Sequence, residues 1–443
     1  MKDQPLSASE FSTYMASFEP FERPPVIAVG VSGGPDSMAL VRLMDQWTRD
    51  RGGRVIGLTL DHGLRDAAAH EAGQVGCWLG KIGGEHHTLE WLGDKPTTAI
   101  QETARHVRRQ MLLSWCRDAG ILHLALAHHA DDQAETYMMR LAHGSGPDGL
   151  AGMAKVTESH NARILRPLLS VPKARLLTTL KTMGQGWVDD PSNEQEVFER
   201  IRVRKALRAM TESGAGRDEI IGVMVDYAQQ RHDLDAVTAD VVMRSISFHA
   251  AGYATIDATA LAACGPVLGA RALSRVLWAI GGRRYQPARD AITRLYDQLN
   301  DSTKAKTLGG CRLVWMKDRW VVCRELRNMP RAVSVTKSAQ LMWDNRLRLD
   351  LVVGDDHPVS EVEIRPLGKR GWRELVTNGP GIQPGFLPEP VRYSLPALYH
   401  NNAIVQVPHL TEPVPKAHHC GVVITKASFA PREPVVGPRF PLA

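Results

Sequence analysis

The 443-residue sequence lacks the features that mark membrane, secreted and zinc-binding proteins. No apolar run approaches the roughly 18 residues that a membrane-spanning helix needs, and the first residues contain an early acid and no apolar stretch typical of secretory signals. The six cysteines are scattered, with no Cys-x-x-Cys pair and no zinc-type spacing with histidine. Free thiols in a reducing compartment are the favoured interpretation, so we expect a cytoplasmic protein that does not bind a membrane.

The composition is that of a folded, mildly basic protein. Hydrophobic residues make up 43% and charged residues 23% of the chain, which argues against a disordered or fibrous protein. The net charge of +6 permits a polyanionic partner without requiring one.

The first half of the sequence alternates between strand and helix patterns. Strand patterns cover residues 26–31, 54–60, 85–91 and 121–127, and helical patterns cover 66–82 and 97–120. Such alternation predicts an α/β fold with a doubly wound parallel sheet, in which ligands bind at the carboxyl ends of the strands. We expect three domains: a catalytic α/β domain over 1–214, a small helical domain over 215–303 and a β-rich domain over 304–443.

The first predicted strand runs into the loop Ser32-Gly33-Gly34-Pro35-Asp36-Ser37. Small residues before a helix N-terminus can present backbone N–H groups to a phosphate, although the loop matches neither the GxxxxGK[ST] nor the GxGxxG pattern. Asp36 beside a phosphate would be repulsive unless a metal ion lay between them, and Mg²⁺ is the natural bridge. A plain turn with a helix cap is the alternative, but the strand before and the helix after favour a phosphate loop.

Acidic residues follow two other predicted strands. Asp61 and His62 end the second, where an adenosine would lie, although a tight turn explains them equally well. After the fourth strand, His128 precedes Asp131, Asp132 and Glu135 in the first turns of a helix. These acids could complement the helix dipole, or could supply a second Mg²⁺ ligand or a base.

Basic residues gather on three predicted helices. They are Arg105, Arg108 and Arg109, then Lys173, Arg175 and Lys181, then Arg200, Arg202 and Arg204. Each group could be a solvated face or a phosphate-binding face. The glycine-rich stretch 143–153 could be a lid over a base or a plain connection.

The loop "SGGPDS" resembles the SGGxDS signature of the PP-loop (N-type) ATP pyrophosphatases. Four further segments, 60–65, 127–136, 144–153 and 189–204, resemble the tRNA(Ile)-lysidine synthetase family in sequence, order and spacing. The resemblance covers about the first 210 residues. It implies a ligase that uses ATP to adenylate the wobble cytidine of the isoleucine tRNA with a CAU anticodon and then joins L-lysine to C2 of that base, which switches decoding from AUG to AUA.

With this resemblance, each candidate residue has an expected role. The ATP-binding residues are Ser32, Gly33, Gly34, Pro35, Asp36, Ser37, Asp61, His62 and His128. The catalytic residues are Asp36, Asp132 and Arg105, with Asp36 and Asp132 also holding Mg²⁺. The tRNA- or substrate-binding residues are Arg108, Asp131, Glu135, Arg200, Arg202 and Arg204. The sequence departs from the family pattern where Arg109 replaces a tyrosine and Ile201 replaces an asparagine.

Two other functions fit part of the pattern. A tRNA thiolase of the same superfamily also adenylates a base, but such enzymes usually need a cysteine relay or an iron–sulfur cluster, and no Cys-x-x-Cys pair is present. A non-catalytic RNA-binding scaffold would need no intact phosphate loop. The sequence leaves the oligomeric state open, with a homodimer as one option.

Overall fold

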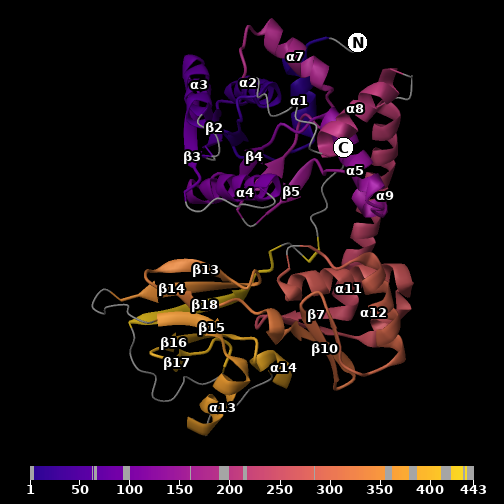
Figure 1. Cartoon of the computed structure of the whole chain (residues 1–443), viewed down its shortest axis with the longest axis vertical. Helices are drawn as coiled ribbons and strands as arrows, with labels where there is room; N and C mark the ends of the chain where they lie inside the picture. Colours follow the sequence, from indigo (N-terminus) through magenta and orange to yellow (C-terminus); the bar gives the residue numbers. More distant parts are fainter. Residues whose placement is uncertain are drawn as a thin grey trace. The chain divides into compact units, whose positions relative to one another are not determined.

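The computed structural model describes residues 4–61, 63, 67–92, 100–159, 161–188, 199–212, 217–283, 285–354, 362–378, 387–410, 421–432 and 435–436. The chain forms two compact units, and the boundary between Asp233 and Leu234 falls inside helix α9 (Figure 1). None of the described helices is long and apolar enough to cross a membrane.

The first unit contains a six-stranded sheet with the order β3-β2-β1-β4-β6-β5. Its strands are β1 (Val26–Gly30), β2 (Arg54–Asp61), β3 (Glu85–Glu90), β4 (His123–Ala125), β5 (Val156–Glu158) and β6 (Arg163–Leu165). All neighbours pair in parallel except β5 with β6. This confirms the predicted parallel sheet and brings the carboxyl ends of β1 and β4 to one edge.

Helices cover both faces of this sheet, as expected for a doubly wound fold (Figure 1). The helices of this part of the chain are α1 (Ala8–Ala16), α2 (Pro35–Arg49), α3 (Ala67–Lys81), α4 (Ile100–Asp118), α5 (Ala130–Ala142), α6 (Pro147–Leu150), α7 (Lys173–Thr182), α8 (Glu199–Glu212) and α9 (Arg217–Ser245), and those packed on the sheet include α2, α3 and α4. Alternate residues of β1 face opposite cores, because strand side chains alternate. Ile27 and Val29 join the core that includes α1, α2, α3 and α7, whereas Ala28 joins the core that includes α4.

The second unit begins with helices packed on a five-stranded sheet of order β7-β8-β11-β10-β9. Its elements are β7 (Ile246–His249), β8 (Tyr253–Ile256), α10 (Ala258–Ala263), α11 (Gly265–Gly281), α12 (Arg289–Asp301), β9 (Lys306–Leu308), β10 (Cys311–Met316) and β11 (Arg319–Arg324). The sequence pattern did not predict β7 and β8, which are only four residues long and lie between long helices. Because β8 pairs with β11, strands from both sides of residue 303, the predicted boundary between the helical and β-rich domains, share this sheet. The division into three domains stays a prediction.

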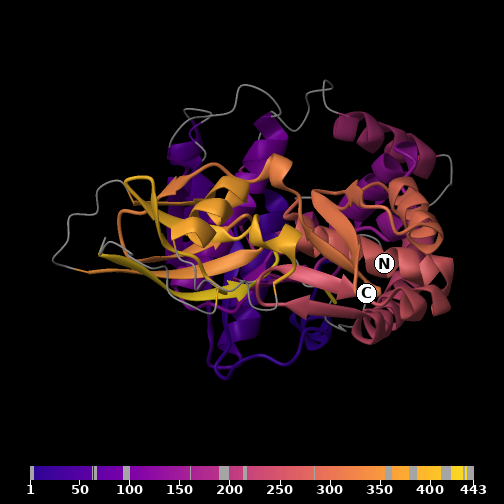
Figure 2. The same ribbon diagram turned by 90° about the horizontal axis from the view of Figure 1, so that it is seen from below.

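The remaining residues confirm the β-rich C-terminal section. A four-stranded sheet (β12-β15-β16-β17) and a three-stranded sheet (β13-β14-β18) contain β12 (Val333–Ser334), β13 (Ala339–Trp343), β14 (Leu347–Val353), β15 (Val362–Pro366), β16 (Pro396–His400), β17 (Ala403–Gln406) and β18 (Val422–Phe429). The helices here are α13 (Gly368–Asn378) and α14 (Glu389–Arg392). Within the second unit, α11 and α12 lie to one side and the strands of these two sheets to the other (Figure 2).

Candidate active site

The loop from Ser32 to Gly34 joins β1 to α2 and is shaped by its small residues. Gly33 has φ +82°, a conformation that favours glycine, and a Cβ there would lie 3.1 Å from Val188 and 3.2 Å from Val75. The Ser37 hydroxyl accepts a hydrogen bond from the Ser32 N–H at 3.1 Å and donates to the Gly34 carbonyl at 2.9 Å. The first turn of α2 thus holds the loop in place, with Pro35 at its start.

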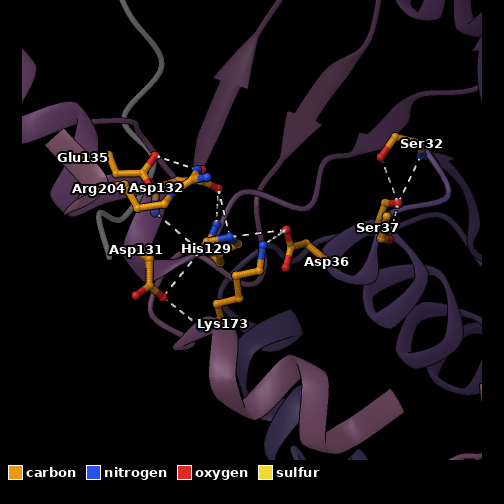
Figure 3. Close-up of polar contacts among 10 residues, drawn as sticks. Ser32, Asp36, Ser37, His129, Asp131, Asp132, Glu135, Lys173 and Arg204 are labelled. Carbon is orange, nitrogen blue, oxygen red and sulfur yellow. Dashed lines mark hydrogen bonds and ion pairs between the residues drawn. The ribbon is translucent and has the colours of Figure 1, made fainter. Parts of the chain in front are cut away.

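Asp36 lies in the first turn of α2 and meets two nitrogen groups from other elements (Figure 3). Its Oδ2 lies 3.4 Å from Nε2 of His129 and 3.4 Å from Nζ of Lys173. His129 precedes α5, and Lys173 begins α7. Three segments far apart in the sequence therefore converge on one carboxylate at the carboxyl edge of the sheet.

Charges around this carboxylate shift two pKa values in opposite directions. Burial acts to raise the pKa of Asp36, but the hydrogen bond and charge of His129 and the charge of Lys173 outweigh it, so the pKa is lowered. Burial acts to lower the pKa of His129, but contact with Asp36 and the charges of Asp132 and Asp131 outweigh it, so that pKa is raised. The directions agree, because each group stabilises the charged form of the other.

The adjacent acids hold the helix ends together. The N–H of Asp132 lies 3.4 Å from Nδ1 of His129, which accepts a hydrogen bond when the ring is neutral, and Oδ2 of Asp132 accepts from the N–H of His129 at 3.1 Å, which makes a capping box. Oδ2 of Asp131 accepts from the N–H of Lys173 at 2.8 Å, so it caps the start of α7. Both acids were predicted at this site, and each also has a local structural task.

Glu135 and Arg204 form a paired contact between α5 and α8. Nε of Arg204 lies 2.7 Å from Oε1 of Glu135, and Nη2 lies 3.3 Å from Oε2. Only 2% of the Glu135 side chain is exposed, compared with 32% for Arg204. The hydrogen bond and charge of Glu135 raise the pKa of Arg204. The structure thus brings together two predicted substrate-binding residues, which form an ion pair with each other.

The glycine-rich segment is attached to α5 by side chains that the sequence pattern did not single out. The Gln133 amide donates to the Met153 carbonyl at 2.9 Å and accepts from the Met153 N–H at 2.8 Å. Nη1 of Arg140 donates to the Gly149 and Gly152 carbonyls at 2.6 and 3.1 Å. The segment predicted as a lid or plain connection is therefore bound to the helix that carries the acids.

The predicted basic residues of α4 belong to a group of arginines. Burial is the largest cause that lowers the pKa of Arg108, Arg140 and Arg166, and the charge of Arg105 lowers each of them further. For Arg166, which is buried and bonded to the Ala154 carbonyl at 2.8 Å, the pKa falls to about 10. The catalytic role of Arg105 and the substrate role of Arg108 stay predictions.

The other predicted residues are less tightly connected to this site. Oδ1 of Asp61, at the end of β2, accepts from the N–H of Gly63 at 2.9 Å and so shapes its own turn. His128 is half-buried beside the α5 cap, and Arg202 is exposed on α8. His62, the Arg200 side chain and residues 189–198 lie outside the described residues. The roles predicted for these residues stay predictions.

Sequence reasoning missed His129 as the central residue and assigned Lys173 only to a basic face. A signal for His129 was present, because it stands three residues before Asp132, the spacing of a capping box. No local pattern points Lys173 toward Asp36, which lies 137 residues earlier in the sequence.

The Asp36 carboxylate fits a divalent cation. Its Oδ1 is buried and has no hydrogen-bond partner in the described part of the chain, so this acceptor is unused there. No group of three or more metal-binding side chains occurs among the described residues. Mg²⁺ commonly takes one or two protein carboxylates and completes its shell with water and phosphate oxygens, so this donor set suits it.

Comparisons with known proteins agree with this geometry. The family model for a PP-loop domain matches residues 7–210. The tRNA(Ile)-lysidine synthase of Bradyrhizobium sp. strain BTAi1 is 40% identical over 250 residues, which are 56% of this chain and 69% of that protein. The enzyme of the same name from Ruegeria pomeroyi is 30% identical over 375 residues, or 83% of this chain and 87% of that one.

A further relative of that name, from Orientia tsutsugamushi, is 31% identical over 351 residues and covers 76% of this chain and 78% of its own. Among solved structures, the U34-tRNA thiolase NcsA from Methanococcus maripaludis matches at 15% identity with a TM-score of 0.43, over 50% of this chain and 77% of that chain. The matches to lysidine synthases extend well beyond the PP-loop domain, and the chain belongs to the tRNA(Ile)-lysidine synthase family.

Proposed function

We propose that this chain joins L-lysine to C2 of the wobble cytidine of the isoleucine tRNA with a CAU anticodon, and that it uses ATP to activate the base. The observation that carries the proposal is the meeting of Asp36 on the phosphate loop with the acidic N-terminus of α5, through His129. The phosphate loop at Asp36 suits a nucleotide, and the acidic N-terminus of α5 suits a cationic amine.

In the first step, the C2 oxygen of the cytosine attacks the α-phosphorus of ATP. The bond from that phosphorus to the bridging oxygen breaks, and pyrophosphate leaves with the electron pair. The backbone N–H groups of the glycines that follow Ser32 and the N-terminus of α2 would face the phosphates and stabilise their charge. Asp36 and Asp132 would hold Mg²⁺, which when bound neutralises phosphate oxygens.

In the second step, the ε-amine of lysine attacks C2, and the adenylated oxygen leaves as AMP. The amine must lose a proton to become a nucleophile and loses another as the new C–N bond forms. Asp132, at 16% side-chain exposure, or Asp131, at 33%, would accept a proton. The same charges attract the lysine ammonium group.

The remaining assignments complete the proposal. Arg105, Arg108 and Arg202 would contact the nucleotides around the target base. The cytoplasm is the proposed location, where the tRNA and lysine are both present. A homodimer stays one option for the assembly, and sedimentation equilibrium of the full chain decides it.

The test is release of pyrophosphate in the presence of ATP, Mg²⁺ and the unmodified tRNA. Asp36→Asn keeps the size of the side chain but removes its charge, and we expect it to lower the rate at least a hundredfold. Asp118→Asn, an exposed acid at the end of α4, is the matched control and is expected to keep the wild-type rate. Equal rates for the Asp36 variant and the wild type would contradict the proposal.

A further inference from the structure

Lys173 occupies an unusual place for a lysine that begins a helix. Its Nζ lies 3.4 Å from Oδ2 of Asp36, and Figure 3 shows its side chain directed at that carboxylate. The Lys173 side chain is 41% exposed, so it is only partly covered where it meets the phosphate loop.

The backbone of Lys173 is held firmly. Its N–H donates to Oδ2 of Asp131 at 2.8 Å, and the N–H of Ala130 donates to the Val171 carbonyl at 3.0 Å, which ties the starts of α5 and α7 together. Leu176 of α7 is buried in the core that also contains residues of α2. The Cα of Lys173 is therefore fixed relative to the loop, and only its flexible side chain is able to change partners.

The neighbouring basic side chains of α7 are differently placed. Arg175 is bound to both carboxylate oxygens of Glu10 at 2.7 Å, and its Nε donates to the Gln4 carbonyl. Lys181 lies exposed in the last turn of α7. Among the contacts of these three basic residues in the described part of the chain, the one that reaches the phosphate loop is that of Lys173 with Asp36.

The chemistry of the loop leaves a role for such a cation. Many phosphate loops carry a lysine that reaches the terminal phosphates of the nucleotide. Here the loop from Ser32 to Ser37 contains no basic residue, and Asp36 is its one charged side chain. The pyrophosphate leaves with negative charge, which a compact ammonium group suits well.

We propose that Lys173 is the phosphate-binding lysine of this site. Its ammonium group exchanges the Asp36 carboxylate for oxygens of the β- and γ-phosphates when ATP binds, and it remains with them as pyrophosphate departs. Lys173 thus supplies from another helix the charge that the loop does not carry. This inference rests on the proposed use of ATP.

The test compares ligands that carry the β- and γ-phosphates or their equivalent with one that lacks them. Equilibrium dialysis with labelled ATP, AMP and pyrophosphate in the presence of Mg²⁺ needs neither tRNA nor lysine. For Lys173→Met, which keeps most of the aliphatic chain, we expect affinity for ATP and pyrophosphate to fall about tenfold or more and affinity for AMP to stay unchanged. Lys173→Arg is expected to recover part of the loss, and Lys181→Met is the matched control on the same helix.

The alternative is that Lys173 only neutralises Asp36. Unchanged ATP affinity in Lys173→Met would overturn the inference. An equal loss of ATP and AMP would also overturn it, because it would show that Lys173 supports the pocket as a whole. If the wild-type chain binds neither nucleotide, the proposed function fails and the inference falls with it, whereas ATP binding that is indifferent to Lys173 removes the inference alone.

Discussion

Replacement of Arg204 is predicted to damage the first unit more than replacement of its partner, Glu135. Arg204→Met removes the guanidinium group that contacts a carboxylate only 2% exposed, and breaking a buried pair in this way costs about 3–5 kcal/mol. Because Arg204 is 32% exposed and water reaches its side of the contact, we expect the lower end, about 3 kcal/mol. Glu135→Met leaves a cation that turns to solvent, so the expected loss is about 1 kcal/mol.

The double variant separates this interaction from general damage. With both residues changed to methionine, no charge is left buried, and we expect stability within about 1 kcal/mol of the wild type. The assay is hydrogen exchange of the slowest amides of α5, which reports the free energy of opening of that helix without requiring two-state unfolding of the whole chain. Equal losses in the two single variants, or a double variant that loses their sum, would show that the Arg204–Glu135 contact is not a buried pair of this kind.

Three further predictions concern the loop, the glycine-rich segment and the central histidine. Gly33→Ala should lower the thermal midpoint, with a loss of about 1–2 kcal/mol from its positive φ and its close neighbours, whereas Gly34→Ala, at φ −68°, should not. Gln133→Leu should speed amide exchange at Met153, because about 1–3 kcal/mol of paired hydrogen bonding is lost there; unchanged exchange would contradict the observed pairing. The pKa of His129 is raised, so its charged form stabilises the fold fully below the ordinary histidine pKa of 6.5. This stabilisation is lost as the pH rises through the raised pKa. NMR titration of the imidazole checks the direction of the shift.

Local patterns were enough to predict the phosphate loop and the sheet around it. Each of these patterns spans only a few positions: the apolar runs of β1 and β2, and the small residues from Ser32 to Gly34. Parallel strand order then brings Asp36 and Asp132 to one edge of the sheet, where the sequence predicted them. This part of the site follows from period, turn chemistry and topology.

The rest of the site depends on contacts between residues far apart in the chain. Arg204 meets Glu135 across 69 positions, and Lys173 meets Asp36 across 137. The sequence identified each residue as charged but did not indicate its partner, since a charged helix face looks the same whether it is solvated or paired.

The glycine-rich segment illustrates the same limit. Its composition suggests freedom to move, yet the Gln133 amide makes two hydrogen bonds to the Met153 backbone, one to its carbonyl and one from its N–H. No sequence pattern around a helical glutamine predicts such a contact, because the contact depends on the path of a loop 20 residues later.

The proposed reaction activates a tRNA base at Asp36 and joins lysine to it. The most direct test is incorporation of radiolabelled lysine into unmodified isoleucine tRNA with a CAU anticodon, with ATP and Mg²⁺, by the wild type and by Asp36→Ala. We expect labelling by the wild type, an equal yield of AMP and pyrophosphate, and loss of labelling in the variant. Pyrophosphate release without lysine incorporation, or labelling that survives in the variant, would contradict it.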